Sequence, residues 1–160
     1  TEQAREMLRK PFVIGQFMYS NGIRKSEVDK FNQEGYLAHS MWIRHETENA
    51  AYQKVGGLSD EAKVLQRGEM MFRGQCASCH TRDGYRAMGV LLKDRDETSV
   101  RNIVRMLHEY KDDSPYRAFM PPLVGKDDEL EALVQYLRTL NVSPRQNSEK
   151  ATQTAQLNQQ

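Results

Sequence analysis

Apolar side chains recur at helical spacing in three segments in the middle of the chain. The first segment follows Ser59, a residue type that favours helix N-caps, and its stripe consists of Val64, Leu65, Gly68, Met71 and Phe72. The second covers residues 97–110, with Val100, Ile103, Val104 and Leu107 on one side. The third begins at Asp127, repeats Leu130, Leu133, Val134, Leu137 and Leu140, and stops at Asn141 and Pro144. No segment shows strand alternation, so the pattern predicts a nearly all-α chain.

Residues 1–58 have a less regular pattern. The most apolar stretch is FVIGQFMY, residues 12–19, whose i,i+4 pairs predict a short helix despite Gly15. Asn21-Gly22 predicts a turn, and Ser26 with Asp29 predicts a capping box for a helix that ends at Gly35. A third segment contains Leu37, Met41 and Trp42 and ends at Gly56-Gly57. We expect these residues to be an N-terminal extension that packs over the following domain, or alternatively an arm that docks a partner.

The end of the chain has a different composition. After Val142 the only large apolar side chain is Leu157, and Gln, Asn, Ser and Thr dominate. Such a segment buries too little apolar surface to offset the entropy of ordering it. The expected organisation is therefore an extension over residues 1–58, one domain over 59–140, and a disordered tail or linker over 141–160.

Composition and charge narrow the function. The 160 residues carry a net charge of +1, which argues against nucleic acid as a partner. No apolar run approaches the ~20 residues of a membrane-spanning helix. Between residues 73 and 105 the chain is locally positive, with Arg73, Arg82, Arg86, Lys93, Arg95, Arg101 and Arg105 against Asp83, Asp94, Asp96 and Glu97. This positive segment would attract an acidic partner.

The two cysteines of the chain lie in one short motif, Cys76-Ala77-Ser78-Cys79-His80. Cys-x-x-Cys-His is the attachment signature of c-type haem, in which both thiols bond to the porphyrin and the histidine binds the iron. Three alternatives exist. A zinc site would need His39, His45 and His108 to supply the missing ligands. A redox dithiol expects a βαβ context, whereas the pattern of this chain predicts helices, and a disulfide here would close a very small loop.

A haem iron held by His80 predicts a second axial ligand. Met120 is the first candidate because Pro121 and Pro122 place it on a stiff, extended turn. Met88, close behind the motif, is the second candidate, and His108 is a further possible ligand. The ordinary role of a methionine is to fill the core, and this is what we expect for Met70, Met71 and Met106.

Three motifs in this order, GEMMFRGQCASCH, FMPPLVG and DDELEALVQYLRTL, resemble those of small bacterial mono-haem c-type cytochromes. The resemblance covers residues 61–140. It implies a helical fold around one covalent haem c, with Cys76 and Cys79 as attachment sites and His80 and Met120 as iron ligands. It also implies that the first and last helices cross, with Gly68 and Phe72 opposite Tyr136 and Leu137. The block KPFVIGQFMYSNGI is similar to stretches preceding cytochrome c domains in membrane respiratory assemblies.

The function implied is one-electron transfer without catalysis, because protein ligands on both sides of the iron leave no position for a substrate. Tyr85 and Arg86 are further candidates for haem contacts. Two alternatives stay open: a haem subunit or domain of a larger membrane oxidoreductase, and a ligand-binding or peroxidase-like haem protein. We expect redox protein partners, acidic ones or a membrane respiratory complex, and a periplasmic or equivalent extracytoplasmic location, with membrane association through a partner as an alternative.

Overall fold

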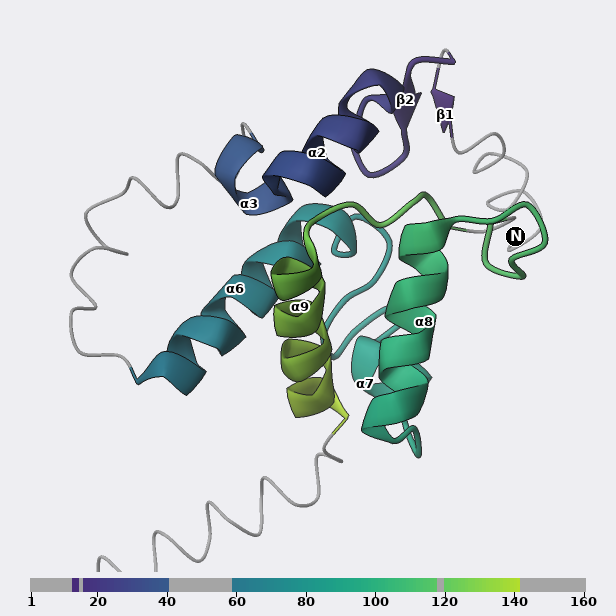
Figure 1. Cartoon of the computed structure of the whole chain (residues 1–160). Helices are drawn as coiled ribbons and strands as arrows, with labels where there is room; N and C mark the ends of the chain where they lie inside the picture. Colours follow the sequence, from purple (N-terminus) through teal and green to yellow (C-terminus); the bar gives the residue numbers. More distant parts are fainter. Residues whose placement is uncertain (1–12, 15, 41–58, 118–119, 142–160) are drawn as a thin grey trace, which may run out of the picture.

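The computed structural model describes residues 13–14, 16–40, 59–117 and 120–141, and these form a helical domain with an N-terminal layer (Figure 1). The domain consists of α6 (Asp60–Gln75), α7 (Met88–Leu91), α8 (Glu97–Glu109) and α9 (Asp127–Leu140). All three long helices match the ranges predicted from the sequence. The Ser59 cap is confirmed as well, since its hydroxyl oxygen accepts a hydrogen bond from the Ala62 N–H at 3.2 Å.

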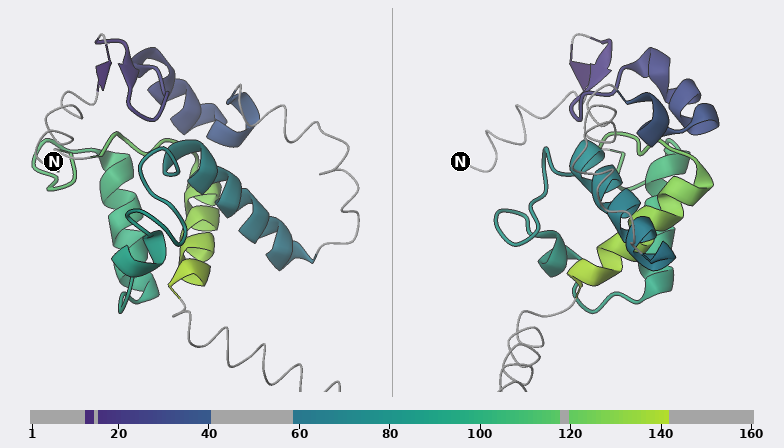
Figure 2. Two further views of the ribbon diagram at one scale, coloured as in Figure 1. Left: turned by 180° about the vertical axis from the view of Figure 1, so that it is seen from behind. Right: turned by 90° about the vertical axis from the view of Figure 1, so that its left-hand side faces the viewer.

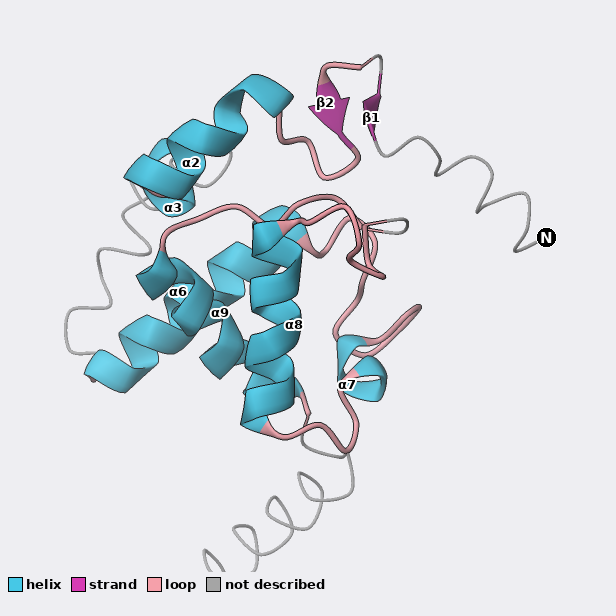
Figure 3. Cartoon of the chain, turned by 45° about the vertical axis from the view of Figure 1, so that its right-hand side comes forward, coloured by secondary structure: helices cyan, strands magenta, loops and turns pink. Residues whose placement is uncertain are grey.

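The N-terminal layer consists of β1 (Val13–Ile14), β2 (Met18–Tyr19), the 3-10 turn η1 (Lys25–Glu27), α2 (Val28–Glu34) and α3 (Tyr36–His39). It lies across one end of the helices of the domain (Figures 1 and 2). Figure 3 shows that β1 and β2 are the only strands within the described residues, so the all-α prediction holds for the fold as a whole.

The predicted helix over residues 12–19 is wrong. Strands β1 and β2 pair there as an antiparallel ribbon, with Val13 opposite Tyr19. Gln16 has a φ of 65°, a left-handed value that a helix does not contain. The Tyr19 N–H then bonds to the Ile23 carbonyl at 2.8 Å, across the predicted Asn21-Gly22 turn, where Gly22 has a φ of 83°. Backbone pairing of β1 with β2, rather than the i,i+4 side-chain pairs, decided the outcome.

The next predicted helix is present as η1 and α2, and Gly35 ends it with a φ of 104°. The Ser26–Asp29 capping box is wrong, because α2 begins after Glu27 and no side chain caps it. Of the third predicted segment, residues 36–39 form α3, while Met41, Trp42 and Gly56-Gly57 lie outside the described residues. The predicted tail over 141–160 also lies outside them, except for Asn141 at the end of α9.

The core of the domain centres on the crossing of α6 and α9. Gly68 lies against the Ala132 carbonyl, and a methyl group in its place would overlap that oxygen and come within 2.6 Å of the Tyr136 Cβ. Four residues further along α6, the Phe72 ring packs on the Tyr136 ring with centroids 5.7 Å apart. The crossing expected at Gly68 and Phe72 is therefore confirmed. Val64 is 37% exposed, so the predicted stripe is buried only in its second half.

The Glu129 carboxylate joins the N-terminal layer to α9. Although it is charged, Glu129 is only 3% exposed. Its two oxygens accept hydrogen bonds from the Tyr36 and Leu37 N–H groups, both at 2.8 Å, and from the Lys126 N–H at 2.9 Å. Nearby, the Asn32 side-chain oxygen accepts from the Gly125 N–H at 3.1 Å. The described part of the N-terminal extension is thus anchored to the domain through buried polar contacts.

Replacing Glu129 by glutamine should lower the free energy of unfolding by about 2–3 kcal/mol, because an amide nitrogen would then face backbone N–H donors in a buried position. Chemical denaturation measures this loss. Glu131→Gln is a matched control on the same helix, since Glu131 pairs with Arg101 near the surface and should cost about 1 kcal/mol or less. Equal losses in the two variants would contradict the anchoring role of Glu129.

Candidate functional site

The cysteine motif forms a tight turn directly after α6. Cys76 caps the helix, with its N–H bonded to the Phe72 carbonyl at 2.8 Å. The Cys76 carbonyl then accepts from the N–H groups of Cys79 at 3.1 Å and His80 at 2.9 Å. This turn places both thiols and the imidazole at one end of α6. Burial, with a smaller contribution from Cys79, raises the pKa of the Cys76 thiol to about 12, so it is a neutral thiol at pH 7.

Met120 lies on the segment that connects α8 to α9. Its N–H bonds to the Tyr116 carbonyl at 2.8 Å, and its carbonyl accepts from the Tyr110 hydroxyl at 3.2 Å. Pro121 and Pro122 follow, and the Leu123 N–H then bonds to the Leu107 carbonyl of α8 at 3.1 Å. The methionine predicted from the sequence is therefore held by backbone bonds on both sides.

Gln75 connects the cysteine turn to the Met120 segment. Its side chain is 6% exposed, and its amide nitrogen donates to the Val124 carbonyl at 2.8 Å while its amide oxygen accepts from the Val124 N–H at 2.9 Å. These two hydrogen bonds pair the Gln75 side-chain amide with the Val124 backbone, as two strands pair in a β-sheet. They fix the last residue of α6 against the connecting segment. The sequence analysis missed Gln75, because a glutamine before a cysteine motif carries no local signal for a partner so far along the chain.

Two adjoining cavities lie between the cysteine turn and the Met120 segment. The first has a volume of about 120 Å³, and Cys79, Arg86, Pro121 and Pro122 are among its lining residues. The second has a volume of about 170 Å³ and is lined mostly by apolar side chains of α7, α8 and α9. The walls of both include Cys76, His80, Leu107, Met120 and Leu123. The thiols, the imidazole and the thioether thus meet around one apolar space.

This donor set fits a covalently held haem. The porphyrin is a large apolar group, and the second cavity offers apolar walls from Val100, Val104 and Leu133, all 3% exposed or less. Both thiols are present as free cysteines at one side of the space. An imidazole and a thioether, both known axial ligands of haem iron, line the same space.

Of the other residues considered for contacts with the haem or its iron, some line the two cavities and one does not. Arg86 lines the first cavity, and its guanidinium lies 5.6 Å from the centroid of the Tyr85 ring. Tyr85 itself is 49% exposed and is absent from the described lining of either cavity. Met88 lines the second cavity and is 9% exposed. Arg95, which was named from the sequence only as part of the positive segment, also lines the second cavity.

His108 is absent from the described lining of the two cavities. Its Nδ1 lies 3.1 Å from the Leu123 carbonyl oxygen, and it lines a separate groove between α8 and α9. The structure therefore does not bring it together with His80 and Met120. The zinc hypothesis gains no support either, because the described residues contain no group of three His, Cys, Asp or Glu side chains that could hold a metal ion. Of its other candidates, His39 lies 3.3 Å from the Glu34 carboxylate in the N-terminal layer, and His45 lies outside the described residues.

Part of the positive segment is neutralised by neighbours. Arg101 bonds to Glu97 at 2.7 Å and to Glu131 at 2.6 Å, and the Arg101 guanidinium lowers the pKa of the Glu131 carboxyl. Glu97 also pairs with Arg138 at 2.6 Å. These ion pairs link α8 to α9. Arg86 and Arg95 are the basic residues of this segment that line the two cavities.

A comparison with protein families decides the identity of this domain. The model of the family described as cytochrome C oxidase, cbb3-type, subunit III, matches residues 63–137. The chain contains a c-type cytochrome domain. No curated protein and no solved structure matches the chain. The matched residues include the cysteine turn, the Met120 segment and most of α6 and α9, but none of the N-terminal layer.

A cytochrome c domain carries covalently bound haem and serves electron transfer rather than catalysis, and such domains are typically extracytoplasmic. No helix among the described residues has the length and apolar character needed to cross a membrane. The family thus supports the general function predicted from the sequence.

Proposed function

We propose that this cytochrome domain holds one haem c, to which Cys76 and Cys79 would form thioether bonds and whose iron His80 and Met120 would bind. The observation that carries the proposal is the apolar space formed by the two cavities. Cys76, His80 and Met120 line both cavities, and Cys79 lines the first. When bound, the haem supplies a one-electron couple between Fe(III) and Fe(II). The protein supplies ligands, an apolar environment and a fixed geometry.

The residues around the proposed ligands keep the site rigid. Gln75 and Val124 lock the end of α6 to the connecting segment, and Tyr110 holds the Met120 carbonyl. A rigid ligand set keeps the geometry similar in both oxidation states, which favours fast electron transfer. We include Arg86 and Arg95 because they line the two cavities, where they can pair with haem propionates or face an acidic partner.

The domain organisation of the proposal follows the sequence prediction: an extension over residues 1–58, the cytochrome domain over 59–140 and a tail or linker over 141–160. The contacts of Glu129 and Asn32 favour an extension that packs on the domain. The physiological role is electron transfer in a respiratory or related chain, outside the cytoplasm. A role as a subunit of a larger membrane oxidoreductase is the second candidate, favoured by the family whose model matches.

The first test is whether the mature protein carries haem on both cysteines. We expect a haem-stained band on a denaturing gel, an intact mass that exceeds the polypeptide by one haem, and thiols that do not alkylate. Cys76→Ser and Cys79→Ser should each lose one attachment bond, whereas Ser78→Ala should retain both. A polypeptide of unmodified mass with two free thiols would end the proposal.

A second measurement separates the free carrier from the subunit. In gel filtration of a native membrane extract, a haem band at the size of the single chain supports the carrier, and co-migration with a large complex supports the subunit. Carbon monoxide binding by the reduced wild-type protein would instead indicate a ligand-binding or peroxidase-like site in which Met120 leaves the iron.

A further inference from the structure

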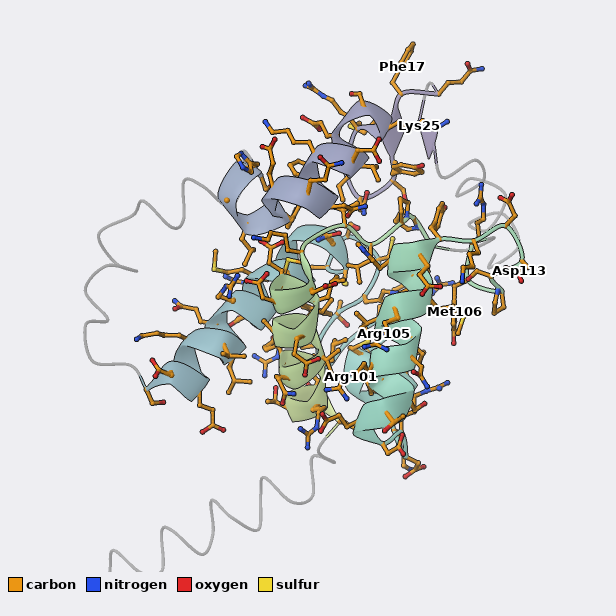
Figure 4. The ribbon with its side chains drawn as sticks, in the orientation of Figure 1. Phe17, Lys25, Arg101, Arg105, Met106 and Asp113 are labelled. Carbon is orange, nitrogen blue, oxygen red and sulfur yellow. The ribbon has the colours of Figure 1, made fainter. Side chains whose placement is uncertain are left out.

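The turn that follows β2 lies at the cytochrome site although it is outside the family match, which begins at residue 63. Ser20 and Asn21 of this turn line the first cavity together with Cys76, His80 and Met120. Figures 1 and 4 show the N-terminal layer lying beside the segment that connects α8 to α9. The N-terminal extension thus supplies part of the wall of the cavity.

Ser20 carries an unused hydrogen-bonding group at this wall. Its hydroxyl oxygen is buried and has no hydrogen-bond partner among the described residues. A buried hydroxyl without a partner costs free energy, so such groups usually indicate a ligand or water at the site. Asn21 differs, because its side-chain oxygen already accepts from the Ile23 N–H at 3.3 Å. The Ser20 hydroxyl is therefore available to a group bound in the cavity.

A second contact connects the same turn to the Met120 segment. The Tyr19 ring meets the Tyr110 ring edge to face, with centroids 6.2 Å apart. The Tyr110 hydroxyl donates to the Met120 carbonyl. The Arg117 guanidinium lies over the Tyr110 ring, 4.9 Å from its centroid. Burial, and to a smaller extent Tyr19, raises the pKa of Tyr110, so its hydroxyl remains a donor at neutral pH. Tyr19 thus packs directly on the residue that fixes Met120.

The turn is itself held firmly. Ile23 is 3% exposed and belongs to the main core, and the Tyr19 N–H bonds to the Ile23 carbonyl. Further along the same layer, Glu129 and Asn32 provide the polar anchors described above. The wall at Ser20 is consequently part of the folded domain.

We propose that the β2 turn, residues 18–24, closes the haem site on its Met120 side, with the Ser20 hydroxyl donating a hydrogen bond within the site and Tyr19–Tyr110 bracing the Met120 segment. This inference rests on the proposed function. It assigns Ser20, Tyr19 and Tyr110 as positioning residues and gives the N-terminal extension a role in setting the reduction potential.

The hydrogen bond and the exclusion of water should both shift the midpoint potential in the same direction. A hydrogen-bond donor stabilises the electron-richer, reduced form of the site, and exclusion of water disfavours the more highly charged oxidised form. Removing the Ser20 hydroxyl, or opening the wall to water, should therefore lower the midpoint potential.

The experiment compares Ser20→Ala with Ser26→Ala in the haem-loaded chain, because Ser26 is exposed on η1 and is absent from the described lining of the first cavity. Redox titration should show a lower midpoint potential for Ser20→Ala only. The far-red charge-transfer band, which reports sulfur bound to ferric iron, should be retained. Ser20→Thr keeps a hydroxyl and should stay near the wild-type potential. Tyr110→Phe should increase the fraction of reduced protein that binds carbon monoxide, on the order of fivefold, the value of one neutral hydrogen bond.

Equal potentials in Ser20→Ala and Ser26→Ala, together with unchanged carbon monoxide binding in Tyr110→Phe, would overturn the inference. This failure is distinct from a failure of the proposed function, which would appear as a retained far-red band in Met120→Ala. Should Ser20→Ala not fold, Ser20→Thr and Tyr110→Phe still carry the test, because each keeps most of the packing at its position. A midpoint potential in Ser20→Thr well below that of the wild type would count against the hydrogen bond.

Discussion

Replacing Met120 by alanine is expected to abolish the far-red charge-transfer band of the oxidised protein while the haem stays covalently attached. The band reports sulfur bound to ferric iron, and alanine has no ligand atom. Because methionine ligation raises the reduction potential, the midpoint potential should fall by an amount on the order of 0.1 V or more, within the ~0.8 V range that axial ligands span. The reduced variant should also bind carbon monoxide. Absorption spectra in both oxidation states and a redox titration measure these effects.

Two further methionines make this prediction specific. Met106 lies on α8 and is absent from the described lining of either cavity (Figure 4), so Met106→Ala should keep the band. Met88 lines the second cavity, and Met88→Ala should keep the band while losing some stability, because a buried side chain is truncated. If the band survives in Met120→Ala and disappears in Met88→Ala, the ligand assignment is reversed.

Replacing Gly68 by alanine should have the largest effect on stability. The added methyl group would overlap the Ala132 carbonyl oxygen, which belongs to the backbone of α9 and cannot rotate away. The two helices would have to separate along their whole contact, loosening the Phe72–Tyr136 ring pair beside it. We expect a loss of about 3 kcal/mol in the free energy of unfolding, at the upper end for overpacking, and a lower yield of haem-loaded protein.

Gly84→Ala provides the matched control for this measurement. Gly84 is exposed, and a methyl group there would approach only the Thr81 side chain, at 3.2 Å from its hydroxyl oxygen. Its cost should be below about 1 kcal/mol. Thermal or chemical unfolding curves for Gly68→Ala that coincide with those of the wild type would show that α6 and α9 do not pack as described.

The elements predicted well from the sequence are those whose information is local. Helix α9 follows from one unbroken apolar period with acidic residues at its start, and the cysteine turn follows from a motif within five consecutive residues. The crossing at Gly68 was expected from the family resemblance, and packing against Ala132 explains it. Met120 was selected as a candidate because the prolines after it mark an unusual backbone, and the structure places it in the walls of both cavities.

The features that the sequence did not reveal depend on partners far along the chain. Gln75 bonds to Val124, and Glu129 bonds to Tyr36, so neither side chain has a local pattern that identifies its role. The helix expected over residues 12–19 failed for a related reason. Its i,i+4 pairs were real, but the backbone pairing of β1 with β2 outweighed them. Likewise, Ser20 could not be linked to the site before the N-terminal layer was placed.

The Glu129 anchor also bears on the order of events during biosynthesis. The carboxylate that receives the Tyr36 N–H lies 93 residues later in the chain, so this contact closes a long loop. Closing so long a loop is a slow, late step compared with the formation of individual helices. The Ser20 turn would therefore settle over the site last, and the nascent cysteine motif would stay accessible for haem insertion until the final helix has formed.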